Sequence, residues 1–391
     1  MNNSIRQRPA LPRSLYQPSL MWTTALLIYA PGLYIVPALL LYVVATEVDN
    51  LALQLALMFP LTILAAYGLN LLGFVGHEGM HLSLTKNRYL SALIGLFYSS
   101  SVVTYFEMGF AMQHWNHHRY TNQELDHDMV LVKRYKTWWS RLLFSRWVYN
   151  WEYFRRTVLT AMGRPNPFHY KIPFKPSEQR VFAWCNLVFA AFWIALYATI
   201  AIKWPMAGLV CIFFPMMTVL FIAACQTYID HAGLGDGVFA NAWSRTSPLM
   251  TAVYFGANYH LEHHAYPGVP CYRLPTVHKL LTASGVYDDP KPPVVRGFLS
   301  AFCNLAAPYE PANSSGDFNP FPVAAAPEPS VRTSAGEVAE GPRSSLSGGA
   351  AADAANTTTP PRNMTLVAAL TTTEAITTAN DGSDARSSSR Y

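Results

Sequence analysis

Three clusters of histidine dominate the chemistry available to this chain of 391 residues. Eight of its 12 histidines lie in the segments 77–81, 114–118 and 260–264. In the first cluster two histidines are four residues apart, and in each of the other two one histidine precedes an adjacent pair. Residues with these spacings share one face of a helix. Because neutral imidazole is a common ligand of first-row metals, the clusters predict a metal site.

The number of histidines favours two metal ions over one. A first-row metal takes about four to six ligands, and a catalytic site leaves one position open. Histidine-rich donor sets suit iron or zinc, and neither the cysteines nor the carboxylates show a comparable spacing. Zinc would be structural or hydrolytic here, whereas iron could activate dioxygen for attack on an apolar substrate. We expect no catalytic residues beyond the metal ligands and no organic cofactor.

Composition and hydropathy place the chain in a membrane. The sequence is 51% hydrophobic and only 13% charged, against about 25% charged in an average soluble domain. Four segments have the roughly 20 apolar residues that cross a bilayer as a helix, and these are 21–45, 51–76, 181–202 and 206–229. A fifth apolar stretch, 89–110, contains three consecutive serines and Glu107, so we expect a re-entrant or interfacial helix there. The predicted fold is therefore an all-α integral membrane protein with four transmembrane helices.

The distribution of Lys and Arg predicts the orientation, because cytoplasmic loops carry an excess of these residues. They are concentrated in the N-terminal arm and in the region 77–180, whereas the loop 46–50 carries Glu47 and Asp49. Both termini and all three histidine clusters are therefore expected on the cytoplasmic side, with the clusters in a helical cap. The basic and aromatic residues of 130–180 fit an amphipathic helix at the headgroup level, a solvated basic cap or a docking surface for an electron donor.

Three regions follow along the chain: a cytoplasmic arm over 1–20, a membrane domain over 21–310 and a tail over 311–391. Ala, Ser, Thr, Gly and Pro dominate the tail, which predicts disorder because so little apolar surface offsets the entropy of ordering. The five cysteines form no CxxC pair, and we interpret them as small buried apolar residues.

The predicted spans contain no Asp, Glu, Lys, Arg or His. A transporter of ions or protons usually needs such groups at mid-depth, so their absence from the spans argues against that class. The remaining non-enzyme alternative is a membrane protein that handles metal. No nucleic-acid partner is expected.

Together, the clusters resemble the histidine boxes of the membrane fatty acid desaturase superfamily. The order HxxxH, HxxHH, HxxHH on a four-span frame is similar, and the run NYHLEHHAYP at 258–267, followed by YRLP at 272–275, is especially like the third box. The resemblance covers roughly residues 60–285. The superfamily includes hydroxylase, ketolase and oxidative decarboxylase branches. The resemblance implies a non-haem diiron centre, O2 as co-substrate, a lipid or fatty acyl substrate, and a separate donor of the ferredoxin, rubredoxin or cytochrome b5 type with its reductase.

The same resemblance implies a set of metal ligands. In the superfamily a ninth histidine follows the fourth span, and His231 occupies that place. The implied ligands are His77, His81, His114, His117, His118, His231, His260, His263 and His264. One acyl-CoA branch has an asparagine four residues before the ninth histidine, where it holds a water on one iron. This chain has Thr227 there, so neither that water nor that branch's substrate carries over.

Other polar residues near the boxes receive lesser roles. We expect His127 to support the ligands without binding metal. Glu78 and Glu262 are expected either to hydrogen-bond ligand imidazoles or to be solvated. His169 and His278 have no cluster partners and are expected to be ordinary surface histidines.

These features predict a membrane-bound, O2-dependent diiron oxidoreductase that acts on fatty acyl chains, with desaturation favoured. Hydroxylation and oxidative decarboxylation to a terminal alkene remain alternatives, because one ligand set serves all three outcomes. A carotenoid hydroxylase or ketolase is also compatible with the boxes.

Overall fold

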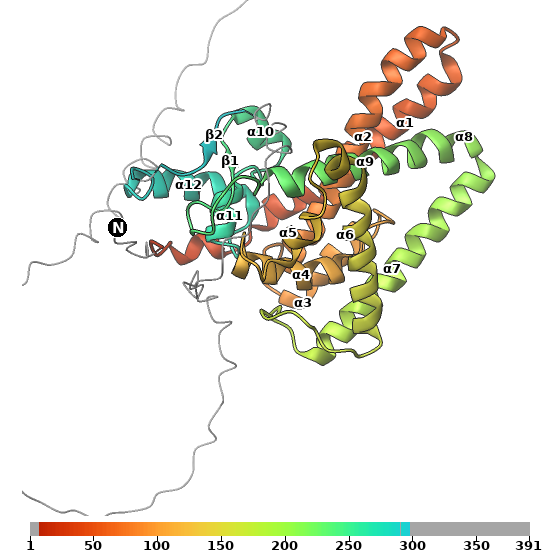
Figure 1. Cartoon of the computed structure of the whole chain (residues 1–391). Coiled ribbons are helices and arrows are strands. Elements are labelled where there is room, and N and C mark those ends of the chain that lie inside the picture. Colours follow the sequence, from red (N-terminus) through yellow and green to blue (C-terminus); the bar gives the residue numbers. More distant parts are fainter. Residues whose placement is uncertain (1–7, 290, 298–391) are drawn as a thin grey trace, which may run out of the picture. The chain divides into compact units, whose positions relative to one another are not determined.

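Long apolar helices in antiparallel pairs form the frame of the computed structural model, which describes residues 8–289 and 291–297. α1 (Leu20–Glu47) and α2 (Leu51–Met80) make the first pair, as Figure 1 shows. The second pair is α7 (Pro176–Lys203) and a segment that runs through α8 (Pro205–Ala207), the π-helical turn η2 (Gly208–Phe213) and α9 (Phe214–Ile229). All four are long and apolar enough to cross a membrane, which confirms the predicted fold class.

The first pair turns tightly at its distal end. Asn50 precedes α2, and its side chain accepts a hydrogen bond from the backbone N–H of Leu53 at 3.0 Å, which caps the helix. Pro31 and Pro37 lie inside α1 without ending it, as neighbouring helices permit within a membrane. The outward faces of these helices expose large apolar side chains, as a lipid-facing surface requires.

Both helix pairs extend past the predicted spans at the histidine end. α2 continues to Met80, so the first histidine cluster begins inside the helix. α7 begins at Pro176, five residues before the predicted span. Tyr34 of α1 donates a hydrogen bond to the backbone carbonyl of Cys211 in the π-helical turn, at 3.0 Å. This contact ties the two pairs together where the regular helical pattern of the fourth span is interrupted.

The apolar stretch 89–110 is not a single helix. α3 (Arg88–Ser99) ends at the three serines, and α4 (Glu107–Tyr120) begins after a short loop. The 12 residues of α3 extend about 18 Å, less than the roughly 30 Å of a bilayer core. Among the described residues α3 is not a candidate span, as expected, and an interfacial position for it stays a prediction.

α3 lies directly against the end of α2. A Cβ atom added to Gly79 of α2 would be only 2.6 Å from the Cα atom of Gly95 in α3. Only glycine at this position allows the two backbones to come so close. The contact fixes the end of α2, which carries the first histidine cluster.

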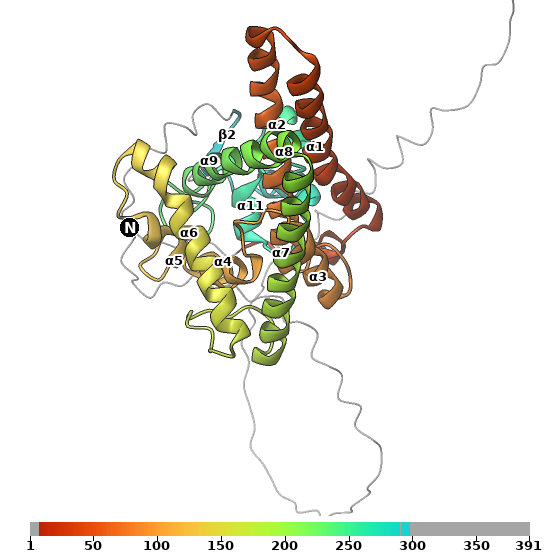
Figure 2. The same ribbon diagram turned by 90° about the vertical axis from the view of Figure 1, so that its right-hand side faces the viewer.

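α6 (Trp138–Ala161) follows the short helix α5 (His127–Val132) and lies beside α7 and α9 (Figures 1 and 2). Its polar side chains Arg141 and Ser145 are buried, whereas Trp139, Trp147 and Trp151 are exposed. The helix therefore has an aromatic outer face, and the three alternatives for this region stay open. Its position at the lipid headgroups stays a prediction.

The remaining elements surround the third histidine cluster. Two short strands, β1 (Ser244–Arg245) and β2 (Val294–Val295), pair in parallel, with Ser244 opposite Val294. The helices of this part are α10 (Pro248–Val253), α11 (His260–Ala265) and α12 (Leu274–Ala283), with 3-10 turns η1 (Arg13–Tyr16) and η3 (Cys271–Arg273). The predicted disordered tail, 311–391, lies outside the described residues, and of the predicted arm only residues 8–20 are described.

Candidate metal centre

The nine histidines implied as ligands come from four places in the chain. His77 lies in the last turn of α2, and His81 is the residue that ends it. α4 carries the second cluster, α11 carries the third, and His231 follows α9. Eight of the nine are buried, and His260 is partly buried. The structure thus brings every one of these residues into the interior, although their role as ligands stays a proposal.

Five of these histidines form one group. Each offers one ring nitrogen, and these nitrogens all lie within 4.8 Å of one another. The Nε2 atoms of His77 and His118 are each 3.0 Å from Nε2 of His114, and Nε2 of His81 is 3.2 Å from Nε2 of His118. The members are His77, His81, His114, His118 and His263.

Three of the other four histidines form a second group, and the fourth adjoins it. His117, His231 and His264 bring one ring nitrogen each within 4.8 Å of one another. Nε2 of His231 lies 3.1 Å from Nε2 of His117 and 3.0 Å from Nε2 of His260, so His260 adjoins the group. The two groups are neighbours, since the ring centroids of His118 and His264 are 4.3 Å apart.

This geometry fits two metal ions. Imidazole nitrogens about 2.1 Å from one first-row ion lie about 3.0 Å apart when they occupy adjacent coordination positions. The Nε2 separations within both groups match that value. In addition, Nε2 of His263 and Nε2 of His264 are buried and have no hydrogen-bond partner among the described residues. Buried polar atoms normally have partners, and a bound ion would supply one here.

In several of these rings Nδ1, the nitrogen that faces away from the centre, contacts another group of the protein. Nδ1 of His231 donates to the backbone carbonyl of Asn241 at 2.8 Å, and Nδ1 of His117 lies 2.9 Å from both carboxylate oxygens of Asp126. Nδ1 of His264 lies 3.1 Å from the hydroxyl oxygen of Thr121. A ring that donates from Nδ1 presents a lone pair on Nε2, the atom that faces the centre.

Burial keeps most of these imidazoles neutral. Desolvation lowers the pKa of seven rings well below the ordinary value, and repulsion between neighbouring rings lowers it further. His117 differs: burial acts to lower its pKa, but the adjacent Asp126 carboxylate outweighs burial and the pKa is raised. Imidazole binds metal in its neutral form, so these histidines are in the protonation state that metal binding requires.

Glu262 anchors α11 from inside the protein. Its carboxylate is fully buried and accepts hydrogen bonds from Ser244, His278 and Tyr287 at 2.5–2.7 Å. His278 is therefore not an ordinary surface histidine, and that expectation was wrong. Residues 244, 278 and 287 are distant in sequence, so no local pattern pointed to this network.

Glu78 has the corresponding position in the first box. It is buried, accepts a hydrogen bond from the Ser83 hydroxyl at 2.7 Å and from the Cys271 backbone N–H at 3.0 Å, and approaches Nδ1 of His77 at 3.4 Å. It therefore links box one to the turn after box three. The alternative in which Glu78 and Glu262 are solvated is excluded by their burial.

The support expected from His127 comes instead from its neighbours. His127 turns toward Glu152, 4.0 Å away, and its side chain is 34% exposed. Asp126 contacts His117, and Asp128 lies 3.9 Å from Nδ1 of His114. The two aspartates therefore contact or approach proposed ligands, and the histidine between them does not. His169 is exposed, as expected.

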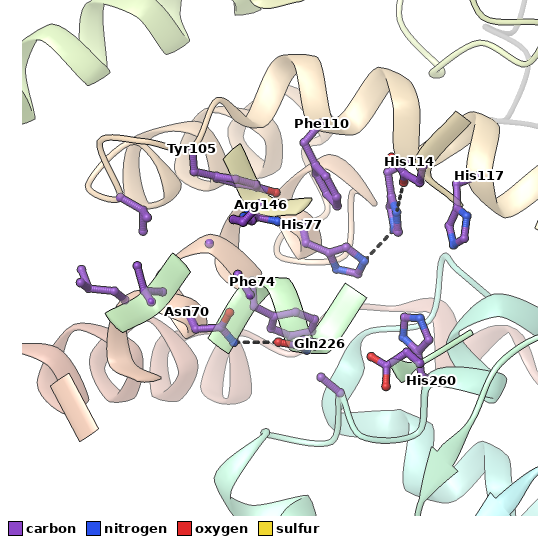
Figure 3. Close-up of a pocket in the computed structure, with 18 of the residues that line it drawn as sticks. Asn70, Phe74, His77, Tyr105, Phe110, His114, His117, Arg146, Gln226 and His260 are labelled. Atoms are coloured by element: carbon purple, nitrogen blue, oxygen red, sulfur yellow. Dashed lines mark hydrogen bonds and ion pairs between the residues drawn. The ribbon is translucent and has the colours of Figure 1, made fainter. Parts of the chain in front are cut away.

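A cavity of about 140 Å³ opens onto the histidines (Figure 3). His77, His114 and His117 form part of its wall, and apolar side chains such as Leu69 and Val219 from the spanning helices form another part. Asn70 and Gln226, which join α2 to α9 by a hydrogen bond of 2.9 Å, also line it. The cavity therefore connects the candidate metal centre with the apolar interior of the helical frame.

Helical spans, buried histidines and an adjoining apolar cavity define a class of membrane protein with a histidine-lined centre for metal. The family model of fatty acid desaturases matches residues 54–293, more than half of the chain. The chain therefore belongs to the fatty acid desaturase family. Among individual curated proteins none matches it significantly. Family membership makes the protein an integral-membrane oxidoreductase of the desaturase and hydroxylase type that acts on lipid.

Proposed function

We propose that this protein is a diiron desaturase that uses O2 to introduce a double bond into a fatty acyl chain. The observation that carries the proposal is the convergence of nine histidines in two adjacent groups, six of which line a largely apolar cavity. Two irons bound there would supply O2 activation. The family is known for diiron sites, and the donor set suits iron.

The proposed division of ligands follows the two groups. His77, His81, His114, His118 and His263 would hold one iron, and His117, His231, His260 and His264 would hold the other. Asp126 and the carbonyl of Asn241 would fix the ring orientations, since each contacts the Nδ1 atom of a proposed ligand.

In the proposed reaction, two hydrogens leave adjacent carbons of the chain and O2 is reduced to two waters. The balance requires two further electrons and two protons, so a separate donor of the ferredoxin, rubredoxin or cytochrome b5 type with its reductase is part of the proposal. The apolar wall of the cavity would hold the chain by burying its methylene groups, each worth about 0.8 kcal/mol.

The proposed orientation puts the histidine-bearing end of the helices in the cytoplasm. The excess of Lys and Arg in the region 77–180 supports this side, which is also where a soluble electron donor would reach the centre.

Product analysis tests the function. The purified protein is assayed for iron per chain, O2 uptake with a fatty acyl substrate and products by mass spectrometry, with His77→Ala, His117→Ala and His263→Ala as variants. We expect two irons per chain, uptake that depends on substrate, an alkene product, and loss of turnover in each variant while membrane insertion persists.

Other results have definite meanings. An alcohol or a terminal alkene would replace desaturation with hydroxylation or decarboxylation at the same centre. Exchangeable metal without O2 uptake would instead favour a metal-handling protein. Near-normal turnover in one of the three variants would remove that histidine's box from the ligand set.

A further inference from the structure

Arg146 of α6 brings a cationic group to the cavity that contains the histidines. It is the only lysine or arginine among the described residues that line this cavity. Its guanidinium lies over the ring of Tyr105, 5.2 Å from the centroid, and near the ring of Tyr153, at 5.8 Å. In Figure 3 Arg146 and Tyr105 lie on the side of the cavity opposite Asn70 and Gln226. The two rings fix the direction of the guanidinium.

Arg146 has no carboxylate within 4.0 Å and no hydrogen-bond acceptor in the described part of the chain. Other arginines nearby do have such partners: Arg245 pairs with Asp230, and Arg156 pairs with Glu152. A guanidinium stays charged at every relevant pH. A partly buried cation beside an apolar cavity is costly without a partner, so an anion that entered the cavity would be bound.

Glu107 and Asp128 interact electrostatically with Arg146, but neither forms an ion pair with it within 4.0 Å. Glu107 is fully buried, and burial raises its pKa well above the ordinary carboxyl value, although the charge of Arg146 acts to lower it. Asp128 accepts a hydrogen bond from the side-chain amide of Gln113 and faces Nδ1 of His114.

A second polar group on the cavity wall also has no partner. The Oγ1 atom of Thr104 is buried and makes no hydrogen bond within the described residues. Thr104 directly precedes Tyr105, the residue on which the guanidinium rests. An oxygen-rich anion at Arg146 could therefore also accept a hydrogen bond from this hydroxyl.

We propose that Arg146 binds the carboxylate of a free fatty acid and so selects the free acid over thioesters and esterified lipids. This inference rests on the proposed function, since it assumes that the cavity holds an acyl chain. A carboxylate matches the planar guanidinium and can accept two parallel hydrogen bonds from it. A thioester has no charge at that end, and the several phosphates of a coenzyme A group would require more than one cation.

The position of Arg146 also determines which carbons reach the histidines. The Tyr105 ring beneath the guanidinium lies 5.5 Å from the ring of Phe110, which stacks on His114 at 4.6 Å. Only two aromatic rings separate the proposed carboxylate site from the candidate metal centre. The carboxyl-proximal part of a long chain would therefore lie beside the histidines, and the methyl end would extend toward the spanning helices.

Binding measurements on the full-length, iron-loaded protein test the proposal. Dissociation constants are measured by calorimetry for palmitate and for methyl palmitate, which lacks the charge. We expect the wild type to prefer the acid by at least about tenfold, the size of a charge-assisted hydrogen bond. Arg146→Gln should abolish the preference while leaving the ester's affinity unchanged, and Arg146→Lys should keep part of it.

Arg134→Gln is the matched control, because Arg134 is exposed and is not among the cavity-lining residues. It should retain the full preference. As an independent readout, the oxidised carbon should keep its position counted from the carboxyl end as the chain length is varied.

The outcomes separate the two proposals. Equal affinity of the wild type for acid and ester, or an unchanged preference in Arg146→Gln, overturns the role of Arg146 alone. The role of Arg146 is also overturned if the oxidised carbon keeps its position counted from the methyl end as the chain length is varied. Failure of the wild type to bind either compound overturns the fatty acyl substrate itself. If Arg146→Gln does not fold, the proposal is tested by the preference of the wild type for the acid and by its partial retention in Arg146→Lys. An unchanged preference in Arg146→Lys together with equal affinities in the wild type is not possible, so the absence of a wild-type preference overturns the role of Arg146.

Discussion

Replacing Asp126 with asparagine should weaken metal binding without altering the fold. Three donors face the Asp126 carboxylate: the backbone N–H groups of Asn122 at 2.8 Å and Met129 at 3.2 Å, and Nδ1 of His117 at 2.9 Å. A carboxylate accepts from all three. Asparagine has a single acceptor oxygen and a donating NH2 group, so at least one donor loses its partner.

The NH2 group of the variant would turn toward either a backbone N–H or the His117 ring. If it faces the ring, Nδ1 of His117 must accept a hydrogen bond, and its proton moves to Nε2, the atom that faces His231. A protonated Nε2 cannot bind a metal. Because asparagine caps helices about as well as aspartate does, α5 should still begin at His127.

Loss of such a supporting contact usually costs about 10–100-fold in metal affinity. At an iron concentration about 100 times the wild-type dissociation constant, binding at one site stabilises the folded protein by about 2.7 kcal/mol. With the affinity lowered by about 10–100-fold, the same iron concentration should give only about 1.4 to 0.4 kcal/mol.

Thermal unfolding at a series of iron concentrations measures the loss of stabilisation. The iron bound per chain at the same concentrations measures the loss of metal affinity directly. Glu124→Gln is the control, since Glu124 is exposed, lies two residues earlier and makes the same change of charge. The reasoning is refuted if Asp126→Asn binds iron as tightly as the wild type, or if Glu124→Gln weakens binding equally.

Two further predictions concern the frame. Gly79→Ala should destabilise the protein by about 1–3 kcal/mol, because the new Cβ would lie 2.6 Å from the Cα atom of Gly95. Gly73→Ala on the same helix, where the nearest atom is 4.0 Å away, should be tolerated, and equal thermal stability of the two variants would contradict the close packing of α2 on α3. Cysteines introduced at the exposed positions Lys86 and Ser177 should be labelled from the cytoplasmic side, and one at Asp49 from the opposite side. Labelling of Lys86 and Ser177 on different faces would overturn the four-span topology.

The frame of this protein was predictable because membrane helices are encoded locally. A continuous run of apolar residues must form a helix in a bilayer, where every backbone group needs an internal partner. The four spans therefore followed from hydropathy, and they agree with the structure to within about one or two helical turns. The division of 89–110 into two helices was missed because its apolar composition continues across the break at the serines.

The candidate ligands were predictable for a related reason. Histidines three and four residues apart share a helix face wherever the helix lies, so each box was visible before its surroundings were known. His231 has no such neighbours and was identified only through the family resemblance, by its place after the fourth span. His278 had no local signal, because its partner Glu262 is 16 residues away on a different helix.

Sequence by itself determined the helical spans and the faces of the helices on which the histidines lie, since both depend on residues within a few turns of one another. Only the tertiary structure decided how the boxes are shared between two groups, with His263 in one and His264 in the other. It alone decided that Asp126 and the Asn241 carbonyl hold ligand rings and that Arg146 faces the cavity. These relations join segments far apart in the chain, and they arise from packing among helices that no local pattern encodes.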